Sequence, residues 1–195
     1  MGKIFCIIGK SSSGKDTLYR QILKDLKEDL SSIVPYTTRP IRTDETDGRE
    51  YFFTDEETLK KLCREGKVVE ARSYHTVYGI WSYFTVDDGQ IDLEKQNYLI
   101  IATIESYIKM RNYFGAEAVV PIYIEVEDGI RLQRALEREG RQKEPKYAEM
   151  CRRFLADLED FSEEKLRRAG ISRRFFNTDL GQTKLKIIEY IRRFL

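Results

Sequence analysis

The chain has 195 residues, and its 41% hydrophobic and 12% aromatic residues supply enough apolar side chains for one ordinary domain with a sizeable core. Its 34 lysines and arginines nearly balance its 33 aspartates and glutamates, so the formal net charge of +1 favours neither nucleic acids nor anionic membranes. The 3 cysteines form no C-x-x-C pair, which argues against a zinc site and suits a reducing compartment. We find neither a signal peptide nor an apolar run near the roughly 18 residues of a membrane span, and therefore expect a cytoplasmic protein.

The first predicted elements are an apolar strand over 4–8, a loop bounded by glycines, and a helix over about 15–29. The loop has the G-x-x-x-x-G-K spacing of a P-loop, in which backbone N–H groups and the helix N-terminus bind phosphate together. Its lysine places a positive charge where the β- and γ-phosphates of a nucleotide would lie. The candidate phosphate-binding residues are Gly9, Lys10, Ser11, Ser12, Ser13, Gly14, Lys15, Asp16 and Thr17. Asp16 stands where the motif has Ser or Thr.

Later elements alternate between strands and helices. Thr54 and Glu57 have the spacing of a capping box and predict a helix that continues to about Glu65. Continuous apolar runs at 98–103 and 119–126 are typical of strands that are buried on both faces. The other predicted elements are strands at 51–53, 67–72 and 80–86 and helices at about 105–114, 128–138, 147–159 and 182–194. This order predicts an α/β fold with a parallel sheet, helices on both of its faces, and ligands at the carboxyl ends of its strands.

Residues 35–86 interrupt the alternation with short strands and aromatic residues, so we predict a small inserted α/β unit with antiparallel strands. Within it, Arg39 and Arg42 lie three residues apart, and Tyr51 follows. Guanidinium groups give bidentate donors to a phosphate monoester, and a phenol adds a neutral donor. The alternative interpretation of residues 39–45, taken alone, is a solvated polar loop.

With these motifs in place, the chain resembles the guanylate kinase family. Residues 37–51 fit the pattern T-T-R-x-x-R-x-x-E-x-x-G-x-x-Y, which is the monophosphate-binding signature of that family. The pair Tyr78-Gly79 and the segment at 177–180, which is similar to the family's N-D-D-L, extend the match over nearly the whole chain. The resemblance implies a P-loop NTPase-type fold in one domain over 1–195, with a core of about 1–34, 87–137 and 154–195, a monophosphate-binding insertion of about 35–86, and a short basic lid of about 138–153.

The resemblance also implies a role for each matching residue. Glu70 would accept hydrogen bonds from N1–H and the amino group of guanine, and Asn177 would lie beside the adenine of ATP. Glu45 would support the arginine loop. The residues implied to hold the phosphate of the acceptor, from the segment and the pair that match, are Arg39, Arg42, Tyr51, Tyr78 and Gly79. Those implied to neutralise charge on the moving phosphoryl group are Lys15, Arg134, Arg138 and Arg153.

The sequence departs from the family pattern at three places. Pro35 and Ile80 stand where the family has hydroxyl side chains that help to read guanine. The strand end near residue 103 lacks the family's D-x-D, and Glu105 is the only carboxylate close by. We hypothesise that Asp16, with Thr17, compensates as a ligand of Mg²⁺, with Glu105 as a further candidate.

The function that the resemblance implies is direct, in-line transfer of the γ-phosphoryl group from MgATP to GMP or dGMP. Two alternatives stay open at this point. One is a kinase of the same fold that acts on another phosphorylated acceptor, such as ribose 1,5-bisphosphate, because Gly14-Lys15-Asp16 also fits some of those enzymes. The other is a non-catalytic binding module. In each case we expect small-molecule nucleotides as partners, no nucleic acid or membrane, and a monomer or weak homodimer.

Overall fold

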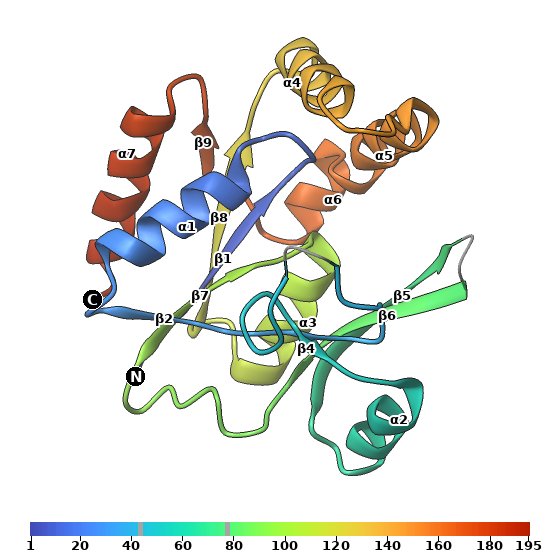
Figure 1. The fold of residues 1–195 in the computed structure, drawn as a ribbon. Helices are drawn as coiled ribbons and strands as arrows, with labels where there is room; N and C mark the ends of the chain where they lie inside the picture. Colours follow the sequence, from blue (N-terminus) through green and yellow to red (C-terminus); the bar gives the residue numbers. More distant parts are fainter. Residues whose placement is uncertain (43–44, 77–78) are drawn as a thin grey trace.

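The computed structural model describes residues 1–42, 45–76 and 79–195, and of Thr76 only the backbone. Within these ranges the chain forms two β-sheets with helices around them (Figure 1). The larger sheet has the strand order β2-β7-β1-β8-β9. Its strands are β1 (Ile4–Gly9), β2 (Leu30–Ser32), β7 (Asn97–Ile101), β8 (Val119–Glu125) and β9 (Arg174–Phe176), and every neighbouring pair is parallel. The prediction of a parallel sheet is confirmed.

Strand β1 lies at the centre of this sheet and is buried along its whole length. Phe5 and Ile7 pack on one face with α1 (Lys15–Asp25) and α7 (Leu180–Arg192). Ile4, Cys6 and Ile8 pack on the other with α3 (Ile104–Phe114) and α6 (Glu163–Arg168). Each face is therefore covered by helices, which explains why the strands are continuously apolar.

The second sheet has the order β4-β3-β6-β5 and is formed by residues between 35 and 86. Its elements are β3 (Tyr36–Thr37), β4 (Phe52–Phe53), β5 (Val68–Thr76), β6 (Gly79–Val86) and the helix α2 (Glu56–Arg64). Strand β6 runs antiparallel to both β5 and β3, but β3 and β4 are parallel. The prediction of antiparallel strands is wrong for this last pair, because a long connection, rather than a tight hairpin, joins Thr37 to Phe52 and returns the chain in the same direction.

Two further differences concern the ends of helices. The N-cap of α2 is Asp55, whose Oδ1 accepts a hydrogen bond of 2.7 Å from the Thr58 N–H. The expected capping box of Thr54 and Glu57 is therefore wrong by one residue, because the carboxylate of Asp55 is the group that satisfies the first turn. Helix α1 ends at Asp25 rather than near residue 29.

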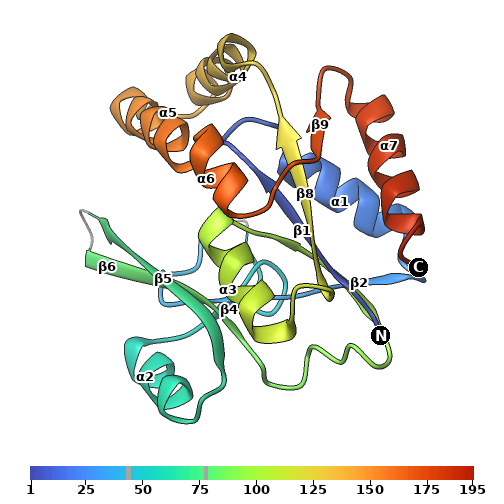
Figure 2. The same ribbon diagram turned by 180° about the vertical axis from the view of Figure 1, so that it is seen from behind.

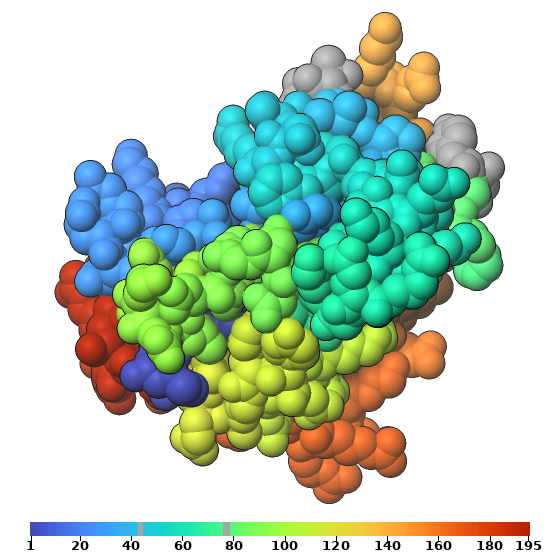
Figure 3. All heavy atoms as spheres, turned by 90° about the horizontal axis from the view of Figure 1, so that it is seen from below, coloured from blue at the N-terminus to red at the C-terminus, as the bar shows by residue number. Residues whose placement is uncertain are grey.

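Helices α4 (Asp128–Gly140) and α5 (Tyr147–Asp160) follow β8 and lie beyond the carboxyl ends of β1 and β8 (Figures 1 and 2). The segment 141–146 joins them. Seen from below, the first residues of the chain lie against the segment that precedes β7 (Figure 3), and Gly2 N–H donates to the Leu93 carbonyl there. Among the described residues, no helix is long and apolar enough to cross a membrane.

Candidate active site

The loop after β1 has the backbone that its sequence predicts. Gly14 is the N-cap of α1 with φ of +83°, and a Cβ there would lie 2.5 Å from Asn177 Nδ2. A Cβ on Gly9 would lie 2.8 Å from the Ile124 carbonyl oxygen. Both positions therefore require glycine. At Gly14 a side chain would be excluded by the backbone conformation and by lack of space, and at Gly9 by lack of space alone. The loop consequently passes close to the end of β8 and to Asn177.

Lys15 begins helix α1, so its charge adds to the positive end of the helix. Its side chain is mostly buried, and Nζ lies 3.7 Å from Asp16 Oδ2. The Asp16 side chain is 71% exposed and projects from the first turn of the helix. Ser13 is buried, and the Oγ atoms of Ser12 and Ser13 have no hydrogen-bond partner among the described residues. The loop thus presents free donors at the start of a helix, as a phosphate site needs.

Asn177 is placed against the loop rather than away from it. Its Nδ2 donates a hydrogen bond of 2.8 Å to the Ser13 carbonyl, and its side chain is buried. Asn177 Oδ1 is buried without a hydrogen-bond partner among the described residues. Arg134 of α4 lies on the other side, with Nη2 at 3.4 Å from the Asn177 carbonyl. Asn177 therefore fixes the loop and also links it to α4.

A network that the sequence did not indicate holds the backbone of Ser11. Ser11 N–H donates to Asp157 Oδ2 of α5 at 2.7 Å, and Ser11 C=O accepts from Arg131 Nη1 of α4 at 3.0 Å. Arg131 is fully buried, and its guanidinium also lies 2.6 Å from Asp128 and 3.5 Å from Asp157. Lys10 Nζ closes the network with a 3.2 Å contact to Asp128.

The position of Arg131 has a physical explanation in the helix spacing. Arg131 lies three residues after Asp128 and four before Ala135, so the three side chains share the inward face of α4. The ring of Phe154 from α5 lies beneath the guanidinium, whose carbon is 4.5 Å from the ring centroid. An arginine on the buried face of a helix was the signal that could have revealed this network.

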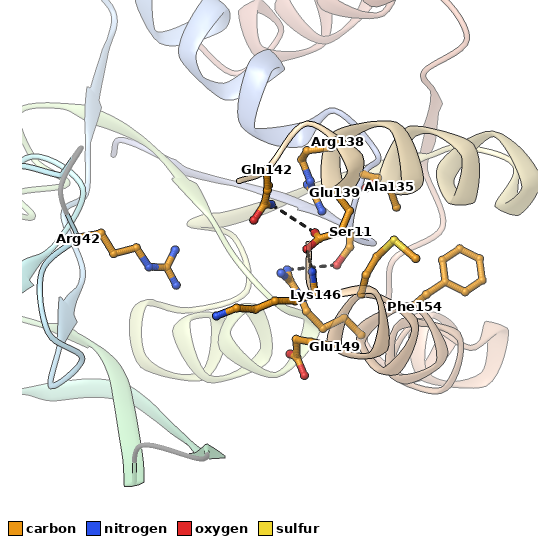
Figure 4. A pocket seen from close by; sticks show the side chains of 12 residues that line it. Ser11, Arg42, Ala135, Arg138, Glu139, Gln142, Lys146, Glu149 and Phe154 are labelled. Atoms are coloured by element: carbon orange, nitrogen blue, oxygen red, sulfur yellow. Dashed lines mark hydrogen bonds between the residues drawn. The ribbon is translucent and has the colours of Figure 1, made fainter. Parts of the chain in front are cut away.

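A cavity of about 410 Å³ lies between the phosphate loop, the helices α4 and α5 with the segment that joins them, and the loop after β3. Figure 4 shows Arg42 reaching toward it from one side, while Ser11 and the side chains of α4 and α5 lie opposite. Arg153 Nη2 lies 3.5 Å from Ser11 Oγ. The lining residues are Ser11, Ser12, Arg42, Ala135, Arg138, Glu139, Gln142, Lys146, Glu149, Met150, Arg153 and Phe154. The cavity thus brings together three of the five predicted arginines, whereas Arg134 lies at Asn177 and Arg39 is not among the lining residues.

The turn between α4 and α5 is held by one carboxylate. Glu139 is buried near the end of α4, and its Oε1 accepts a 2.5 Å hydrogen bond from the Lys146 N–H. Its Oε2 lies 3.3 Å from Gln142 Nε2. Glu139 therefore closes the segment 141–146 from both ends, which determines where Arg138 and Lys146 face the cavity.

The expected phosphate clamp is built around Arg39. Its side chain is buried and donates to both carboxylate oxygens of Glu45, at 2.9 and 2.8 Å. The rings of Tyr51 and Phe53 each lie with their centroid 5.5 Å from its guanidinium carbon. The hydrogen bonds from Arg39 hold the pKa of Glu45 below its usual range, and burial raises the pKa of Tyr51. Arg39 is thus fixed as a cation, and its buried Nε has no hydrogen-bond partner among the described residues.

Glu70 of β5 lies on one face of the second sheet together with Arg72 and with Thr85 of β6. Glu70 is buried, and Thr85 Oγ1 donates to its Oε1 at 3.0 Å. Arg72, two residues along β5, lies beside the carboxylate with Nε at 3.1 Å from Oε2. Gly79 begins β6, and Ile80 beside it is exposed. Tyr78, the remaining predicted clamp residue, lies outside the described residues.

The ion pair of Glu105 is with a residue of its own helix and not with the phosphate loop. Glu105 is exposed in the first turn of α3 and pairs with Lys109 at 2.7 Å. The cap of that helix is Thr103, at the position where the sequence lacks a carboxylate. Among the described residues, no group of three or more His, Cys, Asp or Glu side chains could hold a metal ion. Asp16 and Thr17 nevertheless present oxygen donors beside Lys15, and Mg²⁺ bound to nucleotide phosphates needs only one or two protein oxygens.

Comparison with known proteins decides the family. A sequence model of guanylate kinase matches residues 1–164. The chain belongs to the guanylate kinase family. Guanylate kinases are phosphotransferases that act on nucleoside monophosphates, and this family member carries both the phosphate loop and the arginine loop described above.

Individual relatives and a solved structure support the same family. The guanylate kinase of Thermotoga maritima is 32% identical over 146 residues, which cover 71% of this chain and 67% of that protein. That of Caldanaerobacter subterraneus is 29% identical over 83% of this chain and 74% of its own length. The match to Mycoplasma genitalium guanylate kinase is 36% identical but spans only 40% of this chain and 32% of that protein. A crystal structure of guanylate kinase from Anaplasma phagocytophilum shares the fold, with a TM-score of 0.68 at 19% identity over 98% of this chain and 85% of its own.

Proposed function

We propose that this guanylate kinase family member transfers the γ-phosphoryl group of ATP to GMP or dGMP, giving ADP and GDP or dGDP. One observation carries the proposal: a single cavity is lined by the phosphate loop, by lid arginines, and by Arg42 of the acceptor loop. A donor phosphate at Ser11 and Ser12 and an acceptor phosphate at Arg42 would face each other across it. That arrangement suits direct transfer without a covalent intermediate.

Catalysis in this site consists of positioning and charge neutralisation. Lys15 and the start of α1 bind the donor phosphates. Arg138 and Arg153 reach the transferring phosphoryl group from the lid, and Arg134 with Asn177 orients the nucleoside of ATP. On the acceptor side, the monophosphate is held by Arg39, Arg42, Tyr51, Tyr78 and Gly79. Glu45 fixes the arginines. Closure of the lid over about 138–153 and of the insertion over about 35–86 on the core excludes water and suppresses ATP hydrolysis.

Mg²⁺ is the cofactor that this chemistry uses, bound together with ATP. Asp16 and Thr17 would hold it, with Glu105 as the more distant candidate, and it would neutralise charge on the β- and γ-phosphates. We further propose that the chain works in the cytoplasm as a monomer or weak homodimer on small nucleotides, without nucleic acid or membrane partners.

Replacing Asp16 with alanine is expected to raise the Mg²⁺ concentration for half-maximal activity by about tenfold, because the site loses the carboxylate that follows Lys15 in the first turn of α1. Mg²⁺-dependent binding of a fluorescent ATP analogue should weaken in parallel, whereas its binding without Mg²⁺ should not. Asp25→Ala, at the other end of α1, serves as the matched control. An Asp16→Ala variant with unchanged Mg²⁺ dependence would remove Asp16 from the metal site.

The function itself is tested by ADP formation from MgATP with a panel of acceptors: GMP, dGMP, AMP, CMP, UMP, IMP and ribose 1,5-bisphosphate. We expect strong stimulation by GMP and dGMP. Stimulation by ribose 1,5-bisphosphate alone would assign the chain to the alternative kinase, and tight ATP binding without stimulation by any acceptor would favour a binding module.

A further inference from the structure

Arg72 is a charged side chain inside the acceptor region that no sequence motif indicates. It lies on β5, two residues after Glu70 and opposite Tyr83 of β6, so these side chains share one face of the second sheet. Its side chain is 15% exposed and that of Glu70 is 1% exposed. The ring centroid of Tyr83 lies 5.7 Å from that of Tyr51 in the phosphate clamp. Arg72 therefore borders the place where the acceptor would lie.

The contacts of Arg72 leave part of its guanidinium available. Nη1 donates to Thr103 Oγ1 at 3.1 Å, and Nη2 lies 3.5 Å from Glu70 Oε1. Nε lies 3.1 Å from Glu70 Oε2 as an ion pair, and neither atom has a hydrogen-bond partner among the described residues. A guanidinium has five N–H donors, so two Nη hydrogens have no acceptor in this part of the chain. The side chain is anchored while still able to donate.

Guanine presents donors and acceptors, and O6 lies directly beside N1–H, while N7 is on the neighbouring edge. N1–H and the 2-amino group are donors, which suit a carboxylate, while O6 and N7 are acceptors, which suit an arginine. Glu70 alone can read only the donors. At Pro35 and Ile80 the chain has no hydroxyl that could donate to O6, so a guanine bound at Glu70 would leave that acceptor without a partner.

We infer that Arg72 donates a hydrogen bond to O6 of the guanine base, beside the donors read by Glu70, and thereby determines base specificity. This inference rests on the proposed function, because it concerns the base of the acceptor monophosphate. The pair also offsets a buried negative charge: Glu70 would be costly as an unpaired carboxylate, and Arg72 supplies the opposite charge. The chain thus replaces two neutral donors by one arginine.

Comparison of GMP with IMP in variants tests the inference, because IMP keeps O6 and N1–H but lacks the 2-amino group. Arg72→Met should lower kcat/KM for GMP and for IMP by the same factor, on the order of 10- to 100-fold, with KM for ATP unchanged. Glu70→Gln should instead lower the ratio of the GMP value to the IMP value. Arg64→Met, an exposed arginine on α2, is the matched control and should change neither.

A loss of folded enzyme would lower the apparent kcat for both substrates and leave KM for GMP unchanged, so a rise in KM for GMP keeps the test informative if Arg72→Met is unstable. An unchanged efficiency for both substrates would overturn the role of Arg72. A fall in the GMP to IMP ratio like that of Glu70→Gln would also overturn it, because Arg72 would then act only by holding Glu70. If the wild-type chain does not use GMP at all, the proposed function and this inference both fail. The wild-type measurement therefore separates that outcome from a failure of the role of Arg72 alone.

Discussion

Replacing Lys15 with methionine is expected to lower kcat for phosphoryl transfer by about 10³-fold, the largest effect of any single substitution in the site. Lys15 begins α1 directly after Gly14, and Lys10, the other lysine of the loop, is not free to replace it, because it is paired with Asp128. Methionine keeps the length of the side chain and removes its charge. Steady-state rates at saturating ATP and acceptor measure the effect.

The matched control is Lys24→Met, an exposed lysine in the last turn of the same helix, which should retain wild-type rates. Turnover by Lys15→Met within tenfold of the wild type would contradict the assignment of the donor phosphate to this loop.

Replacing Arg131 with methionine is expected to lower the free energy of unfolding by about 3–5 kcal/mol. The substitution leaves Asp128 with Lys10 alone, leaves Asp157 without a cation among the described residues, and removes the donor to the Ser11 carbonyl. Because Asp157 also accepts from Ser11 N–H, the phosphate loop should shift, and KM for ATP should rise. Urea denaturation and ATP kinetics measure the two effects.

Arg152→Met provides the control for this substitution. Arg152 pairs with Glu149 on the exposed side of α5, where a pair contributes at most about 1 kcal/mol. Adding Asp157→Asn to Arg131→Met should recover part of the lost stability, because it removes one unpaired charge. If Arg131→Met were no less stable than Arg152→Met, the network would not be what holds the loop.

The sequence predicts the three central strands of the larger sheet because their signals are local. Strands such as β1 and β8 are continuous apolar runs, and the glycine spacing of the loop follows from backbone conformation at Gly14 and from space at Gly9. The short strand β9 escapes prediction because it has only three residues, one of which is Arg174 paired with Glu125 and Glu163. Pairing with β8, far away in the sequence, is what makes it a strand.

The residues of the candidate site also fall into two groups: those in local sequence motifs and those that are defined by contacts between distant parts of the chain. Lys15, Arg39 and Glu45 belong to motifs with fixed spacing, so sequence alone singles them out. Arg131 and Asp157 come from two helices, contact each other, and both bind the backbone of Ser11, and no local pattern contains these contacts. Arg72 is likewise defined by Thr103, which lies 31 residues away along the chain. Residues that act through such distant contacts need the structure.

The most direct test of the account is a competition experiment in which the enzyme, MgATP, GMP and ribose 1,5-bisphosphate are incubated together and the products are separated by chromatography. We expect GDP to form in equal amount to ADP, with ribose 1,5-bisphosphate unchanged, since the family match and the buried Glu70 carboxylate, which suits the donors of guanine, both favour GMP as the acceptor. Formation of ADP with consumption of ribose 1,5-bisphosphate and no GDP would contradict the account.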